Sequence, residues 1–309
     1  MERIRKVEHS FYSSKMKNDK KIILLSDLHY YSDMDEKKLL KLAKKIAEER
    51  PDYICISGDL IDDVDEICPL KKADKLINFM EILGDISPVM IGIGNHDITH
   101  FDNKKNQFKY YFNENFWGEL NNINNINVLH NTSYQDDDLL ISGYTLPFDY
   151  YYSKNEESQN IMKKDLSRLR DIVNVDSSRL NINLVHSPIY VTTKEIRHLF
   201  LNYDLVLSGH THDGMLPSIL CDIMPGHWGL MAPDGRPLPK IARGTKQFYD
   251  AELIISGGIT KLSNCNGLIS KLNFTYPSSF DVIDVTGNKD KLTPKKKIRY
   301  VKNVRFTPV

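Results

Sequence analysis

The chain has 309 residues, of which 41% are hydrophobic and 27% charged, as is typical of a folded globular protein rather than a disordered one. Lysine and arginine together number 41, as do aspartate and glutamate, so the formal net charge is zero. A balanced charge argues against binding of nucleic acid through a broad basic surface, although a local site can still hold an anionic substrate.

Five apolar runs with the composition of β-strands end abruptly in small and polar residues. They span residues 21–29, 52–63, 87–97, 180–188 and 203–212. Continuous apolar runs of this length are typical of strands that are buried on both faces. Two later runs, at 251–256 and 279–285, also indicate strands, which we expect to be antiparallel.

Helical patterns lie between these runs, at 35–50, 71–84, 158–174 and 192–200. In the first, Leu39, Leu42 and Ile46 recur at helical spacing, and Pro51 ends the segment. The alternation of strands and helices predicts an α/β protein with central parallel strands. Such sheets bind ligands beyond the carboxyl ends of their strands, so we expect the five polar strand ends to converge on one site.

We expect a single domain over residues 1–309, with a core at about 20–285 and basic extensions at both ends. The chain shows no internal repeat and no Pro/Gly/Ser-rich linker that would mark a boundary. The stretch 213–250 is rich in proline and glycine, and we interpret it either as a surface loop or as a lip that contacts the substrate. The basic tail after Gly287 is interpreted as a solvated extension.

Three features of the sequence predict a cytoplasmic protein. No apolar run reaches the ~20 residues that a membrane span needs. The N-terminal segment is basic but lacks the apolar stretch of a secretory signal. The four cysteines stand far apart without a CxxC pair, so we interpret them as buried thiols in a reducing compartment.

The polar ends of the five strands carry carboxylates, imidazoles and one amide. They are Asp27, His29, Asp59, Asn95, His96, Asp97, His186, His210 and His212. Oxygen and imidazole ligands without a thiolate suit borderline divalent ions. Without His96 and Asp97, seven candidate ligands remain. Seven are too many for one ion and suit two ions ~3.5–4 Å apart that share a carboxylate and a water. Each motif is weak alone, but five of them in order at strand ends are hard to attribute to chance.

The ordered series SDLH, GDL, GNHD, VHSP and GHTH resembles the motifs of the calcineurin-like metallophosphoesterase superfamily over roughly residues 20–285. The resemblance is closest to the bacterial phosphodiesterase branch with a GHTH motif. It implies two mixed β-sheets packed face to face and flanked by helices, which is a four-layer α/β/β/α sandwich with a dimetal site. Asp213 and Met215 stand where that branch usually has glycine and glutamine, so the edge of the pocket is expected to differ.

The resemblance also implies a role for each site residue. The first metal would be held by Asp27, His29 and His212. Asp59 would bridge the two metals, and the second metal would be held by Asn95, His186 and His210. His96 would face the substrate as the general acid, with Asp97 orienting its imidazole. The expected cofactors are two divalent ions, with Mn²⁺ as the first expectation and Fe, Zn, Mg or Ni as alternatives.

The predicted function is hydrolysis of a phosphodiester by a hydroxide that bridges the two metals, with His96 protonating the leaving group. The expected partner is a small phosphorylated or phosphodiester substrate; no nucleic acid and no membrane span are predicted, and the oligomeric state is left open. One alternative is a phosphomonoesterase, disfavoured because GDLIDD lacks the arginine of the protein phosphatase branch, although Arg243 could supply a cation. The other is a non-catalytic metal-binding scaffold, disfavoured because the full ligand set and His96 are present.

Overall fold

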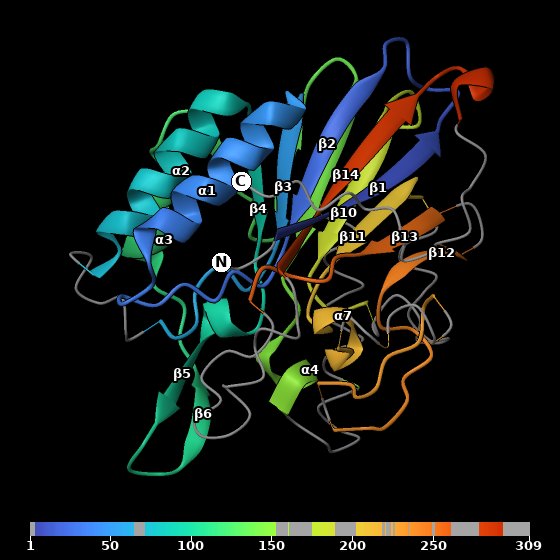
Figure 1. The fold of residues 1–309 in the computed structure, drawn as a ribbon. Coiled ribbons are helices and arrows are strands. Elements are labelled where there is room, and N and C mark those ends of the chain that lie inside the picture. Colours follow the sequence, from blue (N-terminus) through green and yellow to red (C-terminus); the bar gives the residue numbers. More distant parts are fainter. Residues whose placement is uncertain are drawn as a thin grey trace.

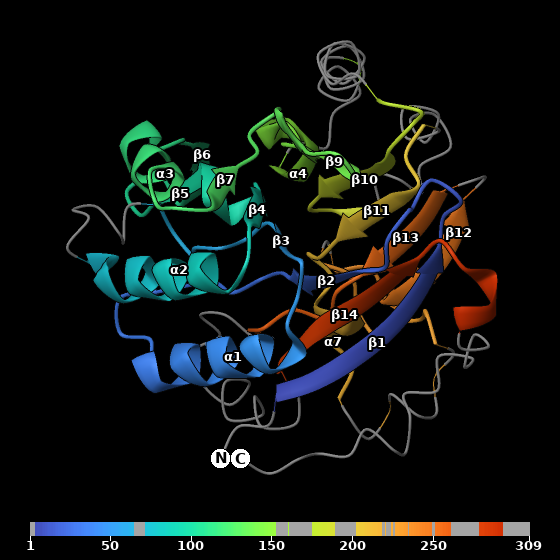
Figure 2. The ribbon, with the colours of Figure 1, turned by 90° about the horizontal axis from the view of Figure 1, so that it is seen from above.

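The computed structural model describes residues 4–64, 72–152, 160, 175–188, 202–217, 220, 224, 226–233, 235–248, 251–260 and 278–292. Its centre is a pair of six-stranded sheets that pack face to face (Figures 1 and 2). Helices cover the outer face of the first sheet (Figure 2). The predicted α/β class with two mixed sheets and flanking helices is confirmed. None of the helices in the described ranges has the length and apolar character needed to cross a membrane.

The first sheet has a mixed strand order. From one edge to the other it runs β1 (Ile4–Tyr12), β14 (Ser278–Thr286), β2 (Lys20–Leu25), β3 (Tyr53–Ser57), β4 (Val89–Gly92) and β7 (Ile126–Val128). Strands β2, β3, β4 and β7 are parallel, and β14 is antiparallel to β2 as expected.

The N-terminal segment, expected to be a basic extension outside the core, forms the edge strand β1. It pairs with β14 along its whole length. The segment looks polar because two of its buried positions carry Arg5 and His9, whose charged partners come from distant parts of the chain. Arg5 pairs with Asp213 at 3.0 Å, and His9 Nε2 lies 2.8 Å from Asp281 Oδ1.

The second sheet includes strands that the sequence did not predict. Its order is β12 (Gly244–Phe248), β13 (Ala251–Ile255), β11 (Leu205–Ser208), β10 (Leu180–Val185), β9 (Leu139–Tyr144) and β8 (Ser133–Gln135). Strand β13, expected to be antiparallel, is parallel to β11 and antiparallel only to β12. The expectation was wrong because part of the Pro/Gly-rich stretch forms β12, which reverses the chain direction before β13.

Neighbouring residues of the central strands face two different cores, which explains their continuous apolar runs. Ile22 and Leu24 of β2 lie in the core between the two sheets, together with Cys55, a buried thiol as expected. Ile23 and Leu25 of the same strand face the helices instead. A strand buried on both faces cannot alternate apolar with polar residues.

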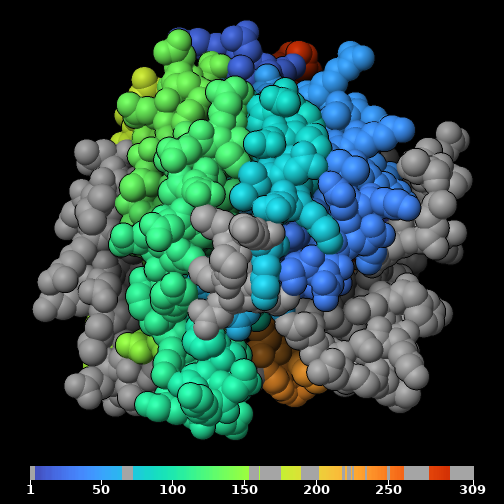
Figure 3. All heavy atoms as spheres, turned by 90° about the vertical axis from the view of Figure 1, so that its left-hand side faces the viewer, coloured from blue at the N-terminus to red at the C-terminus, as the bar shows by residue number. Residues whose placement is uncertain are grey.

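Three helices pack against the outer face of the first sheet (Figure 2), and their part of the chain, in blue, cyan and green, forms the surface on that side of the molecule (Figure 3). They are α1 (Glu36–Glu49), α2 (Asp74–Ile86) and α3 (Glu114–Asn121). The first two confirm the helices predicted at 35–50 and 71–84. The helices predicted at 158–174 and 192–200 lie outside the described residues, apart from position 160.

The short elements that follow the sheets gather at one end of the molecule. The helical turns α4 (Phe148–Tyr152) and α7 (His212–Met215) follow β9 and β11, and the hairpin of β5 (Thr99–Asp102) and β6 (Gln107–Tyr110) projects from the same end (Figure 1). The carboxyl ends of the parallel strands therefore open onto this end, where ligands of α/β sheets bind.

Candidate metal centre

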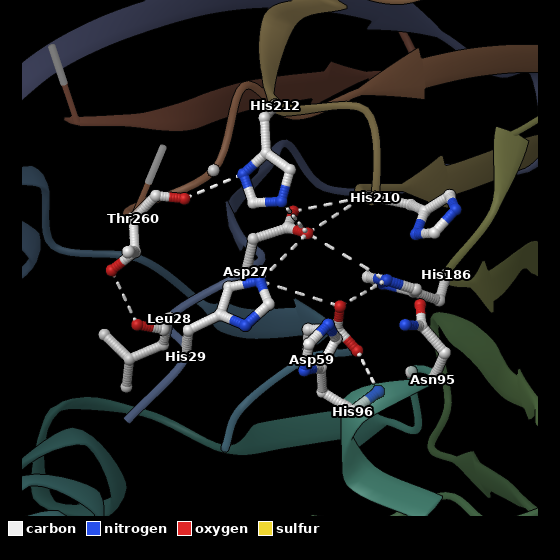
Figure 4. Close-up of polar contacts among 12 residues, drawn as sticks. Asp27, Leu28, His29, Asp59, Asn95, His96, His186, His210, His212 and Thr260 are labelled. Atoms are coloured by element: carbon white, nitrogen blue, oxygen red, sulfur yellow. Dashed lines mark hydrogen bonds and ion pairs between the residues drawn. The ribbon is translucent and has the colours of Figure 1, made fainter. Parts of the chain in front are cut away.

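The predicted ligands lie in the loops that follow five parallel strands. Asp27 and Asp59 each come two residues after the end of a strand, β2 and β3, and Asn95 comes three residues after β4. His186 directly follows β10, and His210 follows β11 by two residues. The loops bring these side chains together with His29 and His212 into one cluster, in which His210 and His212 are half-buried and the others are buried (Figure 4).

The first ligand group consists of Asp27, His29 and His212. One ligand atom of each residue lies within 4.8 Å of those of the other two. The Oδ1 atom of Asp27 is 3.6 Å from Nε2 of His212 and 3.9 Å from Nε2 of His29. Three ligand atoms at this spacing can surround one divalent ion.

The second ligand group consists of Asp59, His186 and His210, whose ligand atoms also lie within 4.8 Å of one another. The Oδ2 atom of Asp59 is 2.9 Å from Nε2 of His186 and 3.7 Å from Nε2 of His29 in the first group. The Oδ2 atom of Asp59 therefore lies between the imidazoles of both groups. Its other oxygen, Oδ1, accepts a hydrogen bond from the backbone amide of His96 at 2.9 Å.

Several buried polar atoms of the cluster have no hydrogen-bond partner among the described residues, including Oδ1 of Asn95 and Nε2 of His29. Buried polar groups are almost always paired, so each such atom needs an explanation. A lone pair on an amide oxygen and one on an imidazole nitrogen are both suited to a cation. The donor set thus fits divalent ions.

Hydrogen bonds to backbone carbonyls set the orientation of two imidazoles. Nδ1 of His186 donates to the carbonyl of Ser57 at 2.8 Å, and Nδ1 of His212 donates to the carbonyl of Thr260 at 2.7 Å. Donation from Nδ1 leaves Nε2 as the lone-pair nitrogen, and in both rings Nε2 faces the carboxylates. The sequence offered no signal for Thr260, which reaches the site from the segment after β13 (Figure 4).

Asp62 is a supporting residue whose place sequence reasoning missed. Asp62 is buried, and its Oδ1 lies 3.1 Å from Nδ1 of His29. Its backbone carbonyl accepts a hydrogen bond from Nδ1 of His96 at 2.7 Å. His29, Asp62 and His96 form a third possible ligand group. Because Asp62 binds both histidines by hydrogen bonds, we interpret it as a support for the first ligand group. Its position three residues after Asp59 was the only available signal.

Asp97 does not orient the imidazole of His96 as expected. Its Oδ2 atom accepts hydrogen bonds from the amides of Asp59 at 2.8 Å and Gly94 at 2.7 Å, and its Oδ1 atom accepts one from Ile61 at 3.1 Å. The fully buried carboxylate thus ties together the loops after β3 and β4. Those amides point inward from two loops that meet only in the folded chain, so the sequence alone could not show them.

The His96 side chain lies at the accessible side of the cluster. It is 27% exposed, whereas the side chain of His29, with its ring centroid 4.6 Å away, is 1% exposed. With Nδ1 donating to Asp62, the other ring nitrogen of His96 is available to an incoming group. His96 is therefore not enclosed by the protein as His29 is.

The buried charges perturb one another strongly. Burial, reinforced by the Asp59 carboxylate, raises the pKa of Asp97 to about 7. Burial opposes protonation of His186, but the neighbouring Asp59 and Asp27 carboxylates outweigh it and raise its pKa to about 9. Burial, together with the charge of His186, lowers the pKa of His210 to about 3. Positive charge inside the cluster is therefore favoured by the carboxylates, and a metal ion can supply it.

The backbone at the ligands adopts a conformation that is rare outside glycine. Five of the seven predicted ligands have positive φ, namely Asp27 at 51°, His29 at 47°, Asp59 at 52°, His210 at 67° and His212 at 47°. Left-handed backbone at non-glycine residues is strained and clusters at functional sites. Close packing adds to this constraint, because a Cβ atom on Gly94 would lie 2.2 Å from Oδ1 of Asp59.

Arg243, considered above as a residue that could supply a cation, is held elsewhere. Arg243 is buried, and it donates from Nε to the carbonyl of Trp228 at 2.9 Å and from Nη2 to the carbonyl of Met224 at 3.3 Å. It thus organises the segment that follows the GHTH loop. Asp213, in the position that departs from the branch pattern, anchors that loop to β1 through its buried pair with Arg5.

Comparison with known proteins agrees with this geometry. Residues 20–214 match the family model for the calcineurin-like phosphoesterase. A Campylobacter jejuni protein described as an uncharacterized metallophosphoesterase is 26% identical over 204 residues, or 65% of this chain and 46% of the relative. A Helicobacter pylori protein of the same description is 26% identical over 213 residues, or 68% of this chain and 49% of the relative. The chain spans about half the length of these curated relatives.

Solved structures of low identity also overlap the chain. A phosphopantetheinyl hydrolase from Mycobacterium tuberculosis is 12% identical, with a TM-score of 0.42 over 89% of this chain and 98% of that one. A dimetal phosphatase from Danio rerio is 12% identical, with a TM-score of 0.40 over 77% of this chain and 87% of that one. The match to the family model covers more than half of the chain, and the chain therefore belongs to the calcineurin-like phosphoesterase family.

Proposed function

We propose that this metallophosphoesterase hydrolyses phosphodiesters with two divalent ions, Mn²⁺ as the first expectation. The observation that carries the proposal is the position of Asp59 Oδ2 between His29 of one ligand group and His186 of the other. Two ions at such a site supply a water of lowered pKa and neutralise the charge on phosphoryl oxygens. A small substrate is favoured over nucleic acid because the chain has no excess of positive charge.

The protein residues then divide the remaining work. Asp27 and Asp59 would hold the ions, and hydrogen bonds at Nδ1 orient the imidazoles of His29, His186 and His212 so that Nε2 of each ring would bind metal. His96 donates a proton to the departing alkoxide, because its ring is the accessible one and is held at Nδ1 by the Asp62 carbonyl.

A diester is favoured over a monoester by the charges around His96. A monoester dianion carries more charge than a diester, and phosphatases commonly use an arginine to bind it bidentately. Here the buried Asp62 lies beside His29 and His96, while Arg5 and Arg243 are engaged with Asp213 and with backbone carbonyls. The loop after β3 thus places negative rather than positive charge at this side of the cluster.

The test begins with metal stoichiometry. Protein stripped of metal and reconstituted with excess Mn²⁺ should hold two ions per chain by elemental analysis, and at most one ion would contradict the proposal. The loaded protein is then assayed for kcat/KM on bis-nitrophenyl phosphate and nitrophenyl phosphate. The diester should be preferred. A tenfold preference for the monoester would instead support the phosphomonoesterase alternative, and no turnover of either by protein with two bound ions would support a scaffold.

A further inference from the structure

A row of four aromatic rings connects the metal centre with the exposed hairpin β5–β6. Tyr152 of α4 stacks between Phe148, with ring centroids 4.7 Å apart, and Phe108 of β6, with centroids 4.8 Å apart. Both pairs have an interplanar angle of 29°. Phe101 of β5 meets Phe108 edge-on at 5.0 Å. We call Phe148, Tyr152, Phe108 and Phe101 the aromatic row.

The aromatic row begins at a predicted metal ligand. The hydroxyl of Tyr152 lies 3.4 Å from Nδ2 of Asn95, so a single ring separates Phe108 from this predicted ligand of the second metal. The next residue back along α4, Tyr151, has its ring 5.3 Å from that of His210. The Tyr151 hydroxyl is buried and has no hydrogen-bond partner among the described residues. A buried phenol with no partner among the described residues can donate a hydrogen bond to a group bound beside the cluster.

The hairpin presents two chemically different faces. Phe101 pairs with Phe108 across the strands, and Tyr110 lies two residues further along β6 on the same face. The opposite face carries the ion pair of Lys109 with Asp102. Phe108 is 42% exposed and Tyr110 is 57% exposed, so the aromatic face is only partly covered by α4. Exposed aromatic surface that continues into a buried site is typical of a ligand-binding surface.

We propose that the aromatic row is the subsite for a planar aromatic group of the substrate, such as a nucleobase. The group stacks on Phe108 while its phosphate reaches the two ligand groups and accepts a hydrogen bond from the Tyr151 hydroxyl. This assignment deepens the phosphodiesterase function proposed above and rests on it. A flat ring continues the stack of Phe148, Tyr152 and Phe108, whereas an alkyl chain would gain only the apolar area that it buries.

The test measures binding of phosphate monoesters to the Mn²⁺-loaded protein by calorimetry. The probes share the phosphate and differ in the attached group: adenosine 5′-monophosphate, butyl phosphate and octyl phosphate. We expect the adenosine ester to bind about tenfold more tightly than butyl phosphate, the scale on which a base stacks on an aromatic ring. Tighter binding of octyl phosphate than of the adenosine ester would overturn the proposal in favour of an acyl-chain subsite.

Two matched variants locate the effect on the row. Phe108→Leu keeps an apolar side chain but removes the flat ring, and it should reduce the adenosine advantage to about one. Tyr111→Leu is the control, because Tyr111 is 41% exposed, like Phe108, but is not in ring contact with the described members of the row. An unchanged adenosine advantage in Phe108→Leu would contradict the proposal.

The outcomes separate the subsite from the reaction. Tight adenosine binding without turnover of any diester would contradict the phosphodiesterase function and support the subsite. Diester turnover without an adenosine advantage would contradict the subsite alone.

Discussion

The two ligand groups differ in what holds their histidines. In the first group His29 donates to the carboxylate of Asp62, whereas in the second group His186 donates to the backbone carbonyl of Ser57. A carboxylate partner raises the basicity of an imidazole ligand more than a neutral carbonyl does. Part of the first group can therefore be weakened by changing one supporting side chain, while His186 is oriented by the main chain. From this comparison we expect the affinities for the two proposed metal ions to be separable by mutation.

The largest effect is expected from Asp59→Asn, which removes the charge between the two groups. Neither ion should then bind with full affinity, and turnover should fall by roughly 10³-fold or more, because several kcal/mol of charge stabilisation depend on the ions. Elemental analysis and kcat on the diester measure the two effects. Retention of both ions with near-normal turnover would mean that the carboxylate is not shared.

The next largest effect is expected from His96→Ala, which should leave both groups loaded. Loss of a general acid typically lowers turnover by ~10²–10⁴-fold. The assay needs a substrate with a poor leaving group, because a good leaving group needs little protonation. His100→Ala is the matched control, since the two side chains are 27% and 29% exposed. If the His96→Ala and His100→Ala variants had equal turnover, His96 would not be the general acid.

A smaller effect, confined to the first group, is expected from Asp62→Asn. Loss of the carboxylate partner of His29 should weaken one of the two metal affinities by roughly 10–100-fold and leave the other unchanged. Titration of metal-free protein with Mn²⁺ resolves the two sites. Asp63→Asn serves as the control, because the neighbouring carboxylate lies in none of the ligand groups among the described residues. Equal weakening of both sites by Asp62→Asn would show that the two groups are not separable.

The smallest effect is expected from Tyr152→Phe, which removes the hydroxyl near Asn95 and keeps the stacked ring. The contact is neutral and long, at 3.4 Å, so we expect a change of less than about threefold in the affinity of the second site. The same Mn²⁺ titration measures it. A loss as large as that in Asp62→Asn would show that neutral partners matter as much as the carboxylate.

Much of the fold could be predicted because its central strands are strongly apolar. The runs at 21–29, 52–63 and 87–97 overlap β2, β3 and β4 and continue into the loops that follow them, and the helices at 35–50 and 71–84 appear as α1 and α2. Several strands were not predicted, among them the edge strands β1 and β12 and the interior strand β9. β1 was missed because its buried Arg5 and His9 read as polar surface, and β12 because its apolar character is weak. An edge strand has a single covered side and so carries a fainter pattern.

The sequence by itself determined which residue types could bind metal, and it placed them after apolar runs. Both properties are local, since a polar residue at the end of a buried strand can be recognised without any partner. Only the tertiary structure decided how those residues are oriented. Asp62, Ser57 and Thr260 became supports of three imidazoles, and Asp97 a clamp on backbone amides, because loops from different strands meet at one end of the two sheets. Hydrogen bonds between such loops depend on positions in space, which no spacing along the chain records.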